Sequence, residues 1–226
     1  MTTFLSHFDV PPYKLSGTVY GTLLNHRKAL EALGESVEQA PYKGAPKAPV
    51  LYVKPRNTLR SAGQRIELPE GTTSVQVGAS LGLVMGRTAC RVPVNSAMDF
   101  VAGYVVVNDL SIPHDSFYRP SLRFKSIDSS CVIGQVVPKA KVKDPDALEV
   151  HIEIDGETAQ TTGTAGMIRP AARLVADVTE FMTLSPGDVL LLGVAHGAPL
   201  ARIGQRVAIC IESVGRFETE LGTEQS

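Results

Sequence analysis

Apolar residues occupy every second position in the stretch TSVQVGASLGLVM, which covers residues 73–85. A period of two is typical of a β-strand with one apolar face. The alternate positions carry small or neutral side chains: Ser74, Gln76, Gly78, Ser80 and Gly82. Such a face has either lost functional side chains or leaves room for something above it.

Strand signals recur along the chain and outnumber helical ones. The run YVVVNDLSI, residues 104–112, is short and β-branched, as a buried strand would be. Residues 148–154 alternate before Asp155-Gly156, a pair typical of a tight hairpin turn. Apolar residues recur at helical spacing from Met167 to Phe181, and shorter helices are expected over residues 27–33 and from Asn95 onward. Because no strict βαβ alternation appears, we predict a β-rich α+β fold.

The length of 226 residues suits one large domain. The first 16 residues include two prolines and lack a clear period, so we predict an N-terminal arm. Residues 17–220 are predicted to form the domain, and residues 221–226 to form a C-terminal tail.

The charge balance and hydropathy exclude several classes of partner. Lys and Arg number 22 against 23 Asp and Glu, a net charge of -1, so neither nucleic acid nor an anionic membrane is an expected partner. No apolar run approaches the ~20 residues that span a bilayer, and the start MTTFLSHFDV lacks a secretion signal pattern. We expect a cytoplasmic protein whose partner is a small molecule or another protein.

Five stretches, in order and spacing, resemble the fumarylacetoacetate hydrolase family. They are LLNHR (23–27), YVKPRNTL (52–59), VAGYVVVNDLSIPHDSFYRPSLRFKSID (101–128), IDGETAQ (154–160) and TLSPGDVLLLG (183–193). The resemblance is strongest to the branch that degrades homoprotocatechuate. That branch includes a bifunctional isomerase/decarboxylase of 4-hydroxyphenylacetate breakdown, which is similar to two copies of this domain fused end to end.

The resemblance implies a mixed β-roll or distorted barrel with flanking helices, and a Mg²⁺ or Mn²⁺ ion held by a Glu-x-Glu pair and a later Asp. Residues two apart on a strand point to the same side, so both carboxylates can reach one hard cation. Counting back from MGR (85–87), the pair falls on Gly78 and Ser80, and only Asp109 of the motif NDLS remains. We therefore expect no tightly bound metal, and we expect glutamates at positions 78 and 80 to create a site.

Other residues of the family's site are present. The resemblance places Lys125, in KSID, toward the substrate, and Tyr118 and Arg119 beside a substrate carboxylate. Lys54 adds positive charge for substrate binding, and His196 lies in an altered turn near the expected substrate. Since Arg and Lys both bind carboxylates, this cluster suits a dianionic seven-carbon acid.

The predicted catalytic residues are Lys125, Asp109 and His114, the last with Asp115 as its orienting acid. Each has a structural alternative: Asp109 as the cap of a turn, Lys125 as a solvated lysine and His114 as a surface residue.

Two functions remain open from the sequence. The first is an isomerase that transfers a proton between the enol and keto forms of 2-hydroxyhepta-2,4-diene-1,7-dioate. This reaction needs a base, an acid and positive charge near the developing enolate, and does not strictly need a metal. The alternative is a non-catalytic or regulatory partner of a metal-bearing paralogue that carries out decarboxylation. Either function is compatible with a homo- or hetero-oligomer.

Overall fold

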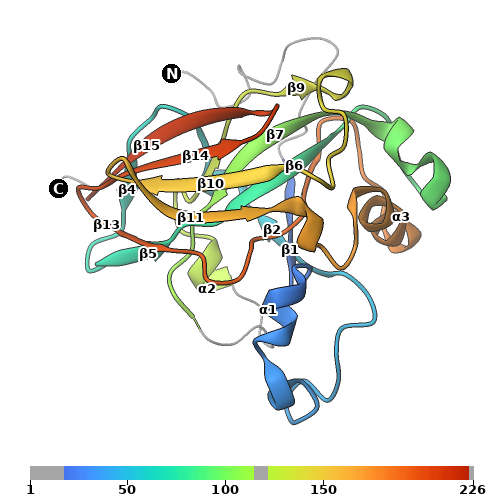
Figure 1. Cartoon of the computed structure of the whole chain (residues 1–226), viewed down its shortest axis with the longest axis horizontal. Helices are drawn as coiled ribbons and strands as arrows, with labels where there is room; N and C mark the ends of the chain where they lie inside the picture. Colours follow the sequence, from blue (N-terminus) through green and yellow to red (C-terminus); the bar gives the residue numbers. More distant parts are fainter. Residues whose placement is uncertain (1–17, 115–121, 224–226) are drawn as a thin grey trace.

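The computed structural model describes residues 18–114 and 122–223 of the chain (Figure 1). The predicted N-terminal arm lies outside these ranges, as do three residues predicted for the site: Asp115, Tyr118 and Arg119. In the described part, the strands form an eight-stranded sheet, a five-stranded sheet and a two-stranded ribbon. The prediction of a β-rich α+β fold is confirmed.

The elements have the following bounds. The large sheet contains β1 (Val19–Leu23), β2 (Val50–Lys54), β3 (Leu59–Ser61), β6 (Ala79–Met85), β7 (Val101–Asp109), β8 (Cys131–Ile133), β9 (Val137–Pro138) and β12 (Val189–Leu191). The five-stranded sheet contains β4 (Ile66–Leu68), β10 (Glu149–Ile154), β11 (Glu157–Gly163), β14 (Arg206–Ile211) and β15 (Gly215–Thr223), and the ribbon pairs β5 (Ser74–Gln76) with β13 (Leu200–Arg202). The helices are α1 (Arg27–Glu31), α2 (Leu122–Lys125) and α3 (Ala171–Phe181), with 3-10 turns at Gly34–Val37, Arg56–Thr58, Val94–Phe100, Lys139–Lys141 and Thr164–Gly166.

The large sheet is strongly curled. Its strand order is β2-β1-β12-β6-β7-β8-β3, so β2 and β7 are four steps apart. At about 4.8 Å per step, a flat sheet would separate them by about 19 Å. Lys54 at the end of β2 nevertheless brings its Nζ atom to 2.9 Å from Oδ1 of Asp109 at the end of β7. The ends of these two strands therefore face each other across the concave side of the sheet.

Two hydrophobic clusters lie on opposite faces of the large sheet. The larger one contains residues of this sheet, the five-stranded sheet and α3. The smaller one lines the inside of the curl and contains Val19, Leu59, Val84, Val105, Val107, Cys131, Ile133, Val189 and Leu191. Strand β6 is consequently buried on both faces, rather than on one.

Packing explains part of the small-residue pattern in the opening stretch. Leu81 and Leu83 belong to the larger cluster, as the alternation predicts. A Cβ atom on Gly82 would lie 2.7 Å from the Val105 side chain and 2.8 Å from that of Val189. The inside of the curl thus admits only small side chains on this part of β6.

The predicted strand over residues 73–85 is divided into β5 and β6. Gln76 N donates to the carbonyl of Ser111 at 2.7 Å, and Val77 N donates to that of Pro199 at 2.8 Å. These bonds direct β5 into the ribbon with β13, and the large sheet begins only at Ala79. Gly78 lies at the break, where its carbonyl accepts a hydrogen bond from Asp109 N at 2.8 Å.

Local predictions hold best where the signal is short-range. The Asp155-Gly156 hairpin is confirmed, with φ values of +53° and +84° that match a type I′ turn. Helix α3 follows Pro170 and ends at Phe181, while the helix expected over residues 27–33 is shorter. Strand β15 continues through Thr223, so its last residues pair with β4 in the segment predicted as a tail. No helix of the described ranges is long and apolar enough to cross a membrane.

Candidate functional site

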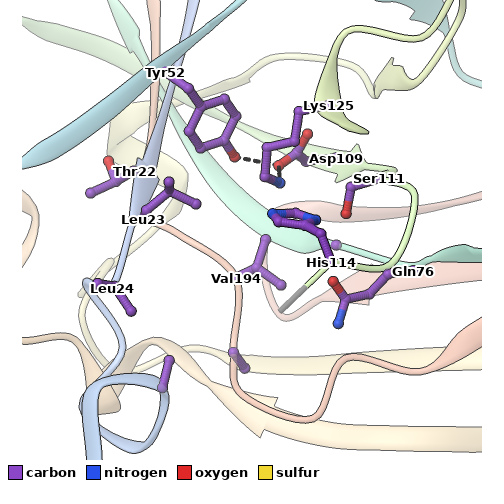
Figure 2. Close-up of a pocket in the computed structure, with 13 residues that line it drawn as sticks. Thr22, Leu23, Leu24, Tyr52, Gln76, Asp109, Ser111, His114, Lys125 and Val194 are labelled. Atoms are coloured by element: carbon purple, nitrogen blue, oxygen red, sulfur yellow. Dashed lines mark hydrogen bonds and ion pairs between the residues drawn. The ribbon is translucent and has the colours of Figure 1, made fainter. Parts of the chain in front are cut away.

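A buried carboxylate occupies the end of β7. Oδ1 of Asp109 lies 2.9 Å from Lys54 Nζ, and Oδ2 accepts a hydrogen bond from Lys125 Nζ at 2.8 Å. The Tyr52 hydroxyl also donates to Oδ2, and Figure 2 shows Tyr52 and Lys125 converging on the carboxylate. Asp109 therefore meets two ammonium groups and one hydroxyl.

The fold explains how these groups meet. Tyr52 and Lys54 are two residues apart on β2, so their side chains point to the same side. The curl of the sheet turns that side toward the end of β7. Lys125 is the last residue of α2, and its backbone carbonyl accepts a hydrogen bond from Lys54 Nζ. Lys54 thereby joins the ends of β2, β7 and α2.

Electrostatics keep Asp109 ionised. Burial alone would raise the pKa of Asp109, but attraction to Lys125 and Lys54, with hydrogen bonds from Lys125 and Tyr52, lowers it below its usual value. A general base works best when its pKa lies near the operating pH. The structure thus argues against Asp109 as the group that shuttles the proton, and favours a role in positioning the lysines.

Tyr52 remains a proton donor. Burial and the neighbouring Asp109 charge raise the pKa of Tyr52 well above its usual value. Its hydroxyl therefore keeps its proton at neutral pH and donates to the carboxylate. The Lys125 Nζ atom also lies 4.6 Å from the centre of the Tyr52 ring, a cation–π contact that adds to the restraint on Lys125.

A pocket opens beside this cluster, with a volume of about 550 Å³ that includes the space at its mouth. Its polar lining residues are Thr22, Tyr52, Gln76, Asp109, Ser111, His114 and Lys125, and its other lining residues are Leu23, Leu24, Ala29, Gly78, Val194 and Ala195. In Figure 2, Leu23 and Leu24 lie on one side of the pocket, opposite Asp109 and Ser111. The pocket therefore offers polar contacts to one side of a ligand and apolar contacts to the other.

His114 lines the pocket in an oriented form. Its ring stacks on Phe124 with 5.0 Å between centroids and 6° between planes, and its Nδ1 lies 3.0 Å from the carbonyl oxygen of Ile112. A carbonyl oxygen only accepts, so Nδ1 must carry the hydrogen. In the neutral ring the lone pair is then on Nε2, the form that a general base requires.

The remaining predicted residues have different positions. Lys54 is fully buried and does not line the pocket, so the structure contradicts its prediction as a direct substrate ligand. The side chain of His196 is exposed and also absent from the described lining, while its carbonyl accepts a hydrogen bond from Gln160 at 2.9 Å. Tyr118 and Arg119 lie outside the described residues.

The sequence interpretation missed Tyr52, Gln76 and Ser111. Tyr52 carried a usable signal, because it lies two residues before Lys54 on a predicted strand and therefore shares its face. Gln76 and Ser111 are brought together by backbone hydrogen bonds between β5 and the residues after β7. No local pattern predicts that pairing.

The described residues do not fit a magnesium or manganese site built from protein carboxylates. Ser80 Oγ donates to the Gly193 carbonyl at 3.0 Å and accepts from Gly193 N at 3.2 Å, so it is committed to the backbone. Both oxygens of Asp109 face the lysines and Tyr52. Among residues 18–114 and 122–223, no group of three or more His, Cys, Asp or Glu is placed to hold a metal. The absence of a tightly bound metal remains a prediction.

Gly78 cannot accept a side chain on this backbone. A Cβ atom there would lie 2.3 Å from the Asp109 carbonyl oxygen and 3.1 Å from Cγ2 of Val194. The nearest atom is backbone and has no rotamer by which to move away. This contact argues against the expectation that glutamates at positions 78 and 80 create a metal site, because a side chain at position 78 would have to displace the Asp109 backbone.

We expect Gly78→Ala to lower the free energy of unfolding by about 1–3 kcal/mol, the usual cost of forcing extra atoms into a packed site. Urea denaturation measures this loss. Gly134→Ala is the graded control, since its Cβ would come no closer than 3.2 Å to any neighbour. Equal effects at the two glycines would show that the contact with Asp109 does not restrict position 78.

Comparison with known proteins identifies the family. The family described as "Fumarylacetoacetate (FAA) hydrolase C-terminal" matches residues 18–221. The chain is 38% identical over 211 residues to the 4-hydroxyphenylacetate degradation bifunctional isomerase/decarboxylase of Escherichia coli, covering 93% of this chain and 48% of that protein. It thus spans about half the length of this curated relative. It is also 34% identical over 181 residues to the mitochondrial oxaloacetate tautomerase FAHD1 of Arabidopsis thaliana, covering 78% of this chain and 81% of that protein.

Solved structures of two related enzymes have the same fold as this chain. The 5-carboxymethyl-2-hydroxymuconate delta-isomerase from Mycobacterium smegmatis superimposes with a TM-score of 0.78 at 27% identity, covering 94% of this chain and 81% of that chain. The fumarylpyruvate hydrolase from Pseudomonas aeruginosa, solved with Mn²⁺ and pyruvate, has the same fold, with a TM-score of 0.77 at 23% identity over 94% of this chain and 91% of that chain. This chain belongs to the fumarylacetoacetate hydrolase family.

Proposed function

We propose that this chain is an isomerase that transfers a proton between the enol and keto forms of 2-hydroxyhepta-2,4-diene-1,7-dioate, in the degradation of 4-hydroxyphenylacetate. The observation that carries the proposal is the Lys54–Asp109–Lys125 cluster beside a pocket that contains an oriented His114. Two lysines and one carboxylate leave one positive charge in excess, which favours a ligand with an anionic oxygen. The isomerases among the relatives support the same reaction class.

The proposed isomerisation needs a base and a positive charge near the enolate, which His114 and Lys125 would supply. The enol O–H bond breaks, a C–H bond forms on the conjugated chain, and the double bonds shift without any oxidant or reductant. Lys125 places a positive charge near the enolate oxygen while that charge develops. Nε2 of His114 takes the enol proton and returns it to carbon. Tyr118 and Arg119 remain proposed ligands for the substrate carboxylate.

The test follows the ultraviolet absorbance of the conjugated enol diacid as it becomes the ketone. We expect the purified chain to accelerate this loss above the rate in buffer. Dialysis against a chelator should leave the rate unchanged, because in this proposal the cationic groups beside the ligand are lysines rather than a metal. An activity that disappears on chelation and returns with Mn²⁺ would contradict this account.

A second candidate is a partner subunit for a metal-bearing paralogue. It is favoured by the match to about half of a bifunctional relative and by the poor fit of the described residues to a metal site. Such a chain would form a hetero-oligomer rather than act as a homo-oligomer. An inactive chain that ketonises or decarboxylates substrate only when mixed with a metal-bearing homologue would establish this function in place of the first.

A further inference from the structure

Two lysines face one carboxylate at the base of the pocket, although only one of them lines it. The Lys54 side chain is fully buried, and Lys125 is the lysine that lines the pocket. Both ammonium groups lie within 3 Å of an Asp109 oxygen, at 2.9 and 2.8 Å. The arrangement raises the question of what the second, inaccessible lysine contributes.

The Lys54 ammonium group is surrounded by protein groups and not by the pocket. An ammonium group has three N–H donors. Lys54 Nζ donates two of them, to Ser130 Oγ at 2.9 Å and to the Lys125 carbonyl, and it forms an ion pair with Asp109 Oδ1 at 2.9 Å. Lys54 is fully buried and does not line the pocket, so its effect on a ligand must pass through its neighbours.

Lys125 is in the opposite situation. Among the described residues, its Nζ contacts one acceptor, Oδ2 of Asp109, and lies over the Tyr52 ring. Two of its three donors are therefore available to a ligand in the pocket. Its charge, however, faces a carboxylate of opposite sign at 2.8 Å. With Asp109 alone beside it, the pair would be neutral and would attract an anion weakly.

We propose that Lys54 is a positioning residue that neutralises Asp109, so that the positive charge of Lys125 remains for an anionic ligand. The proposal rests on the proposed function, in which that ligand is an enolic diacid. Asp109 fixes Lys125 in place, and Lys54 offsets the charge that this restraint introduces. The three groups together hold one net positive charge at the wall of the pocket.

A double substitution separates this role from a merely structural one. Lys54→Met keeps most of the length of the side chain and removes its charge, which leaves Asp109 and Lys125 neutral as a pair. Adding Asp109→Asn removes the negative charge as well, and the positive charge of Lys125 is restored to the pocket. A structural role for Lys54, through Ser130 and the Lys125 carbonyl, would not be rescued by the second substitution.

The probe is heptanedioate, a saturated seven-carbon diacid, and its dissociation constant is measured by calorimetry. We expect Lys54→Met to weaken binding about 10- to 100-fold, the effect of one lost charge at about 6 Å in a medium of intermediate dielectric. Lys54→Met/Asp109→Asn should recover most of the affinity. Lys139→Met is the matched control, since Lys139 also donates to a backbone carbonyl, that of Met98 at 2.7 Å, but lies outside the described lining.

A second measurement needs no ligand. Lys54→Met should lower the melting temperature of the wild-type chain, yet raise that of the Asp109→Asn chain, where Lys54 is a buried charge without a counter-charge. The proposal would be overturned if Lys54→Met lowered the melting temperature of both the wild-type and the Asp109→Asn chain. It would also be overturned if the double variant were folded but bound the diacid no better than Lys54→Met. If the wild-type chain fails to bind the diacid, the proposed function is at fault, and the sign reversal in melting temperature still decides the pairing of Lys54 with Asp109.

Discussion

Replacing Asp109 with alanine is expected to lower the free energy of unfolding by about 3–5 kcal/mol, as the removal of one partner from a buried ion pair does. The substitution leaves Lys54 and Lys125 buried close together with no counter-charge. It also removes the acceptor of the Tyr52 hydroxyl, in a position where water has little access. Urea denaturation followed by circular dichroism gives the free energy directly.

Asp128→Ala provides the control for this prediction. Asp128 is an exposed carboxylate three residues after the end of α2. It accepts one hydrogen bond from Asn57 Nδ2 at 2.5 Å. A surface substitution of this kind usually changes stability by no more than about 0.5 kcal/mol. Similar small losses at both positions would show that the lysine cluster is solvated rather than buried.

Replacing Lys125 with methionine is expected to lower kcat about 100- to 1,000-fold, the range for removing one group that stabilises a developing oxyanion. Methionine retains most of the side-chain volume, and Asp109 keeps Lys54 as its counter-charge. The fold should therefore survive while the positive charge at the pocket wall is lost. The affinity for heptanedioate should also fall, by about 1.5–3 kcal/mol.

The matched control for Lys125 is again Lys139→Met, which removes a lysine outside the described pocket lining. Initial rates of ketonisation over a range of substrate concentrations separate kcat from KM for both variants. A Lys125→Met chain with unchanged kcat would reduce Lys125 to a structural partner of Asp109. It would also remove the main support for the proposed mechanism.

The sequence predicts those parts of the fold that depend on neighbouring residues. The Asp155-Gly156 turn, the alternation in β6 and the helical spacing before Phe181 are local signals, and each corresponds to an observed element. The break at Gly78 was not predictable in this way. It depends on hydrogen bonds to Ser111 and Pro199, whose positions are set by other parts of the chain.

In the candidate site, too, the sequence does not predict what depends on distant parts of the chain. The resemblance predicts Asp109 and Lys125, and the neighbouring Asp115 suggests His114; all three residues line the pocket. The position of Lys54 follows from the curl of the large sheet, which brings β2 to β7 across three intervening strands. A pattern of residues along the chain contains no measure of that curl. For this reason the sequence predicts Lys54 as a substrate ligand, whereas in the structure it is buried in the ion-pair cluster with Asp109 and does not line the pocket.

The central claim is that this chain by itself directs a proton to one carbon of an enolic diacid. The most direct measurement is nuclear magnetic resonance, recorded in a chiral aligning medium, of the product formed in D₂O, because the carbon that receives the proton becomes a CHD stereocentre whose two configurations are enantiomers. The account predicts that the wild-type chain, after dialysis against a chelator, yields one configuration of the deuterated product faster than buffer does. An equal mixture of the two configurations, formed at the rate in buffer, would contradict it.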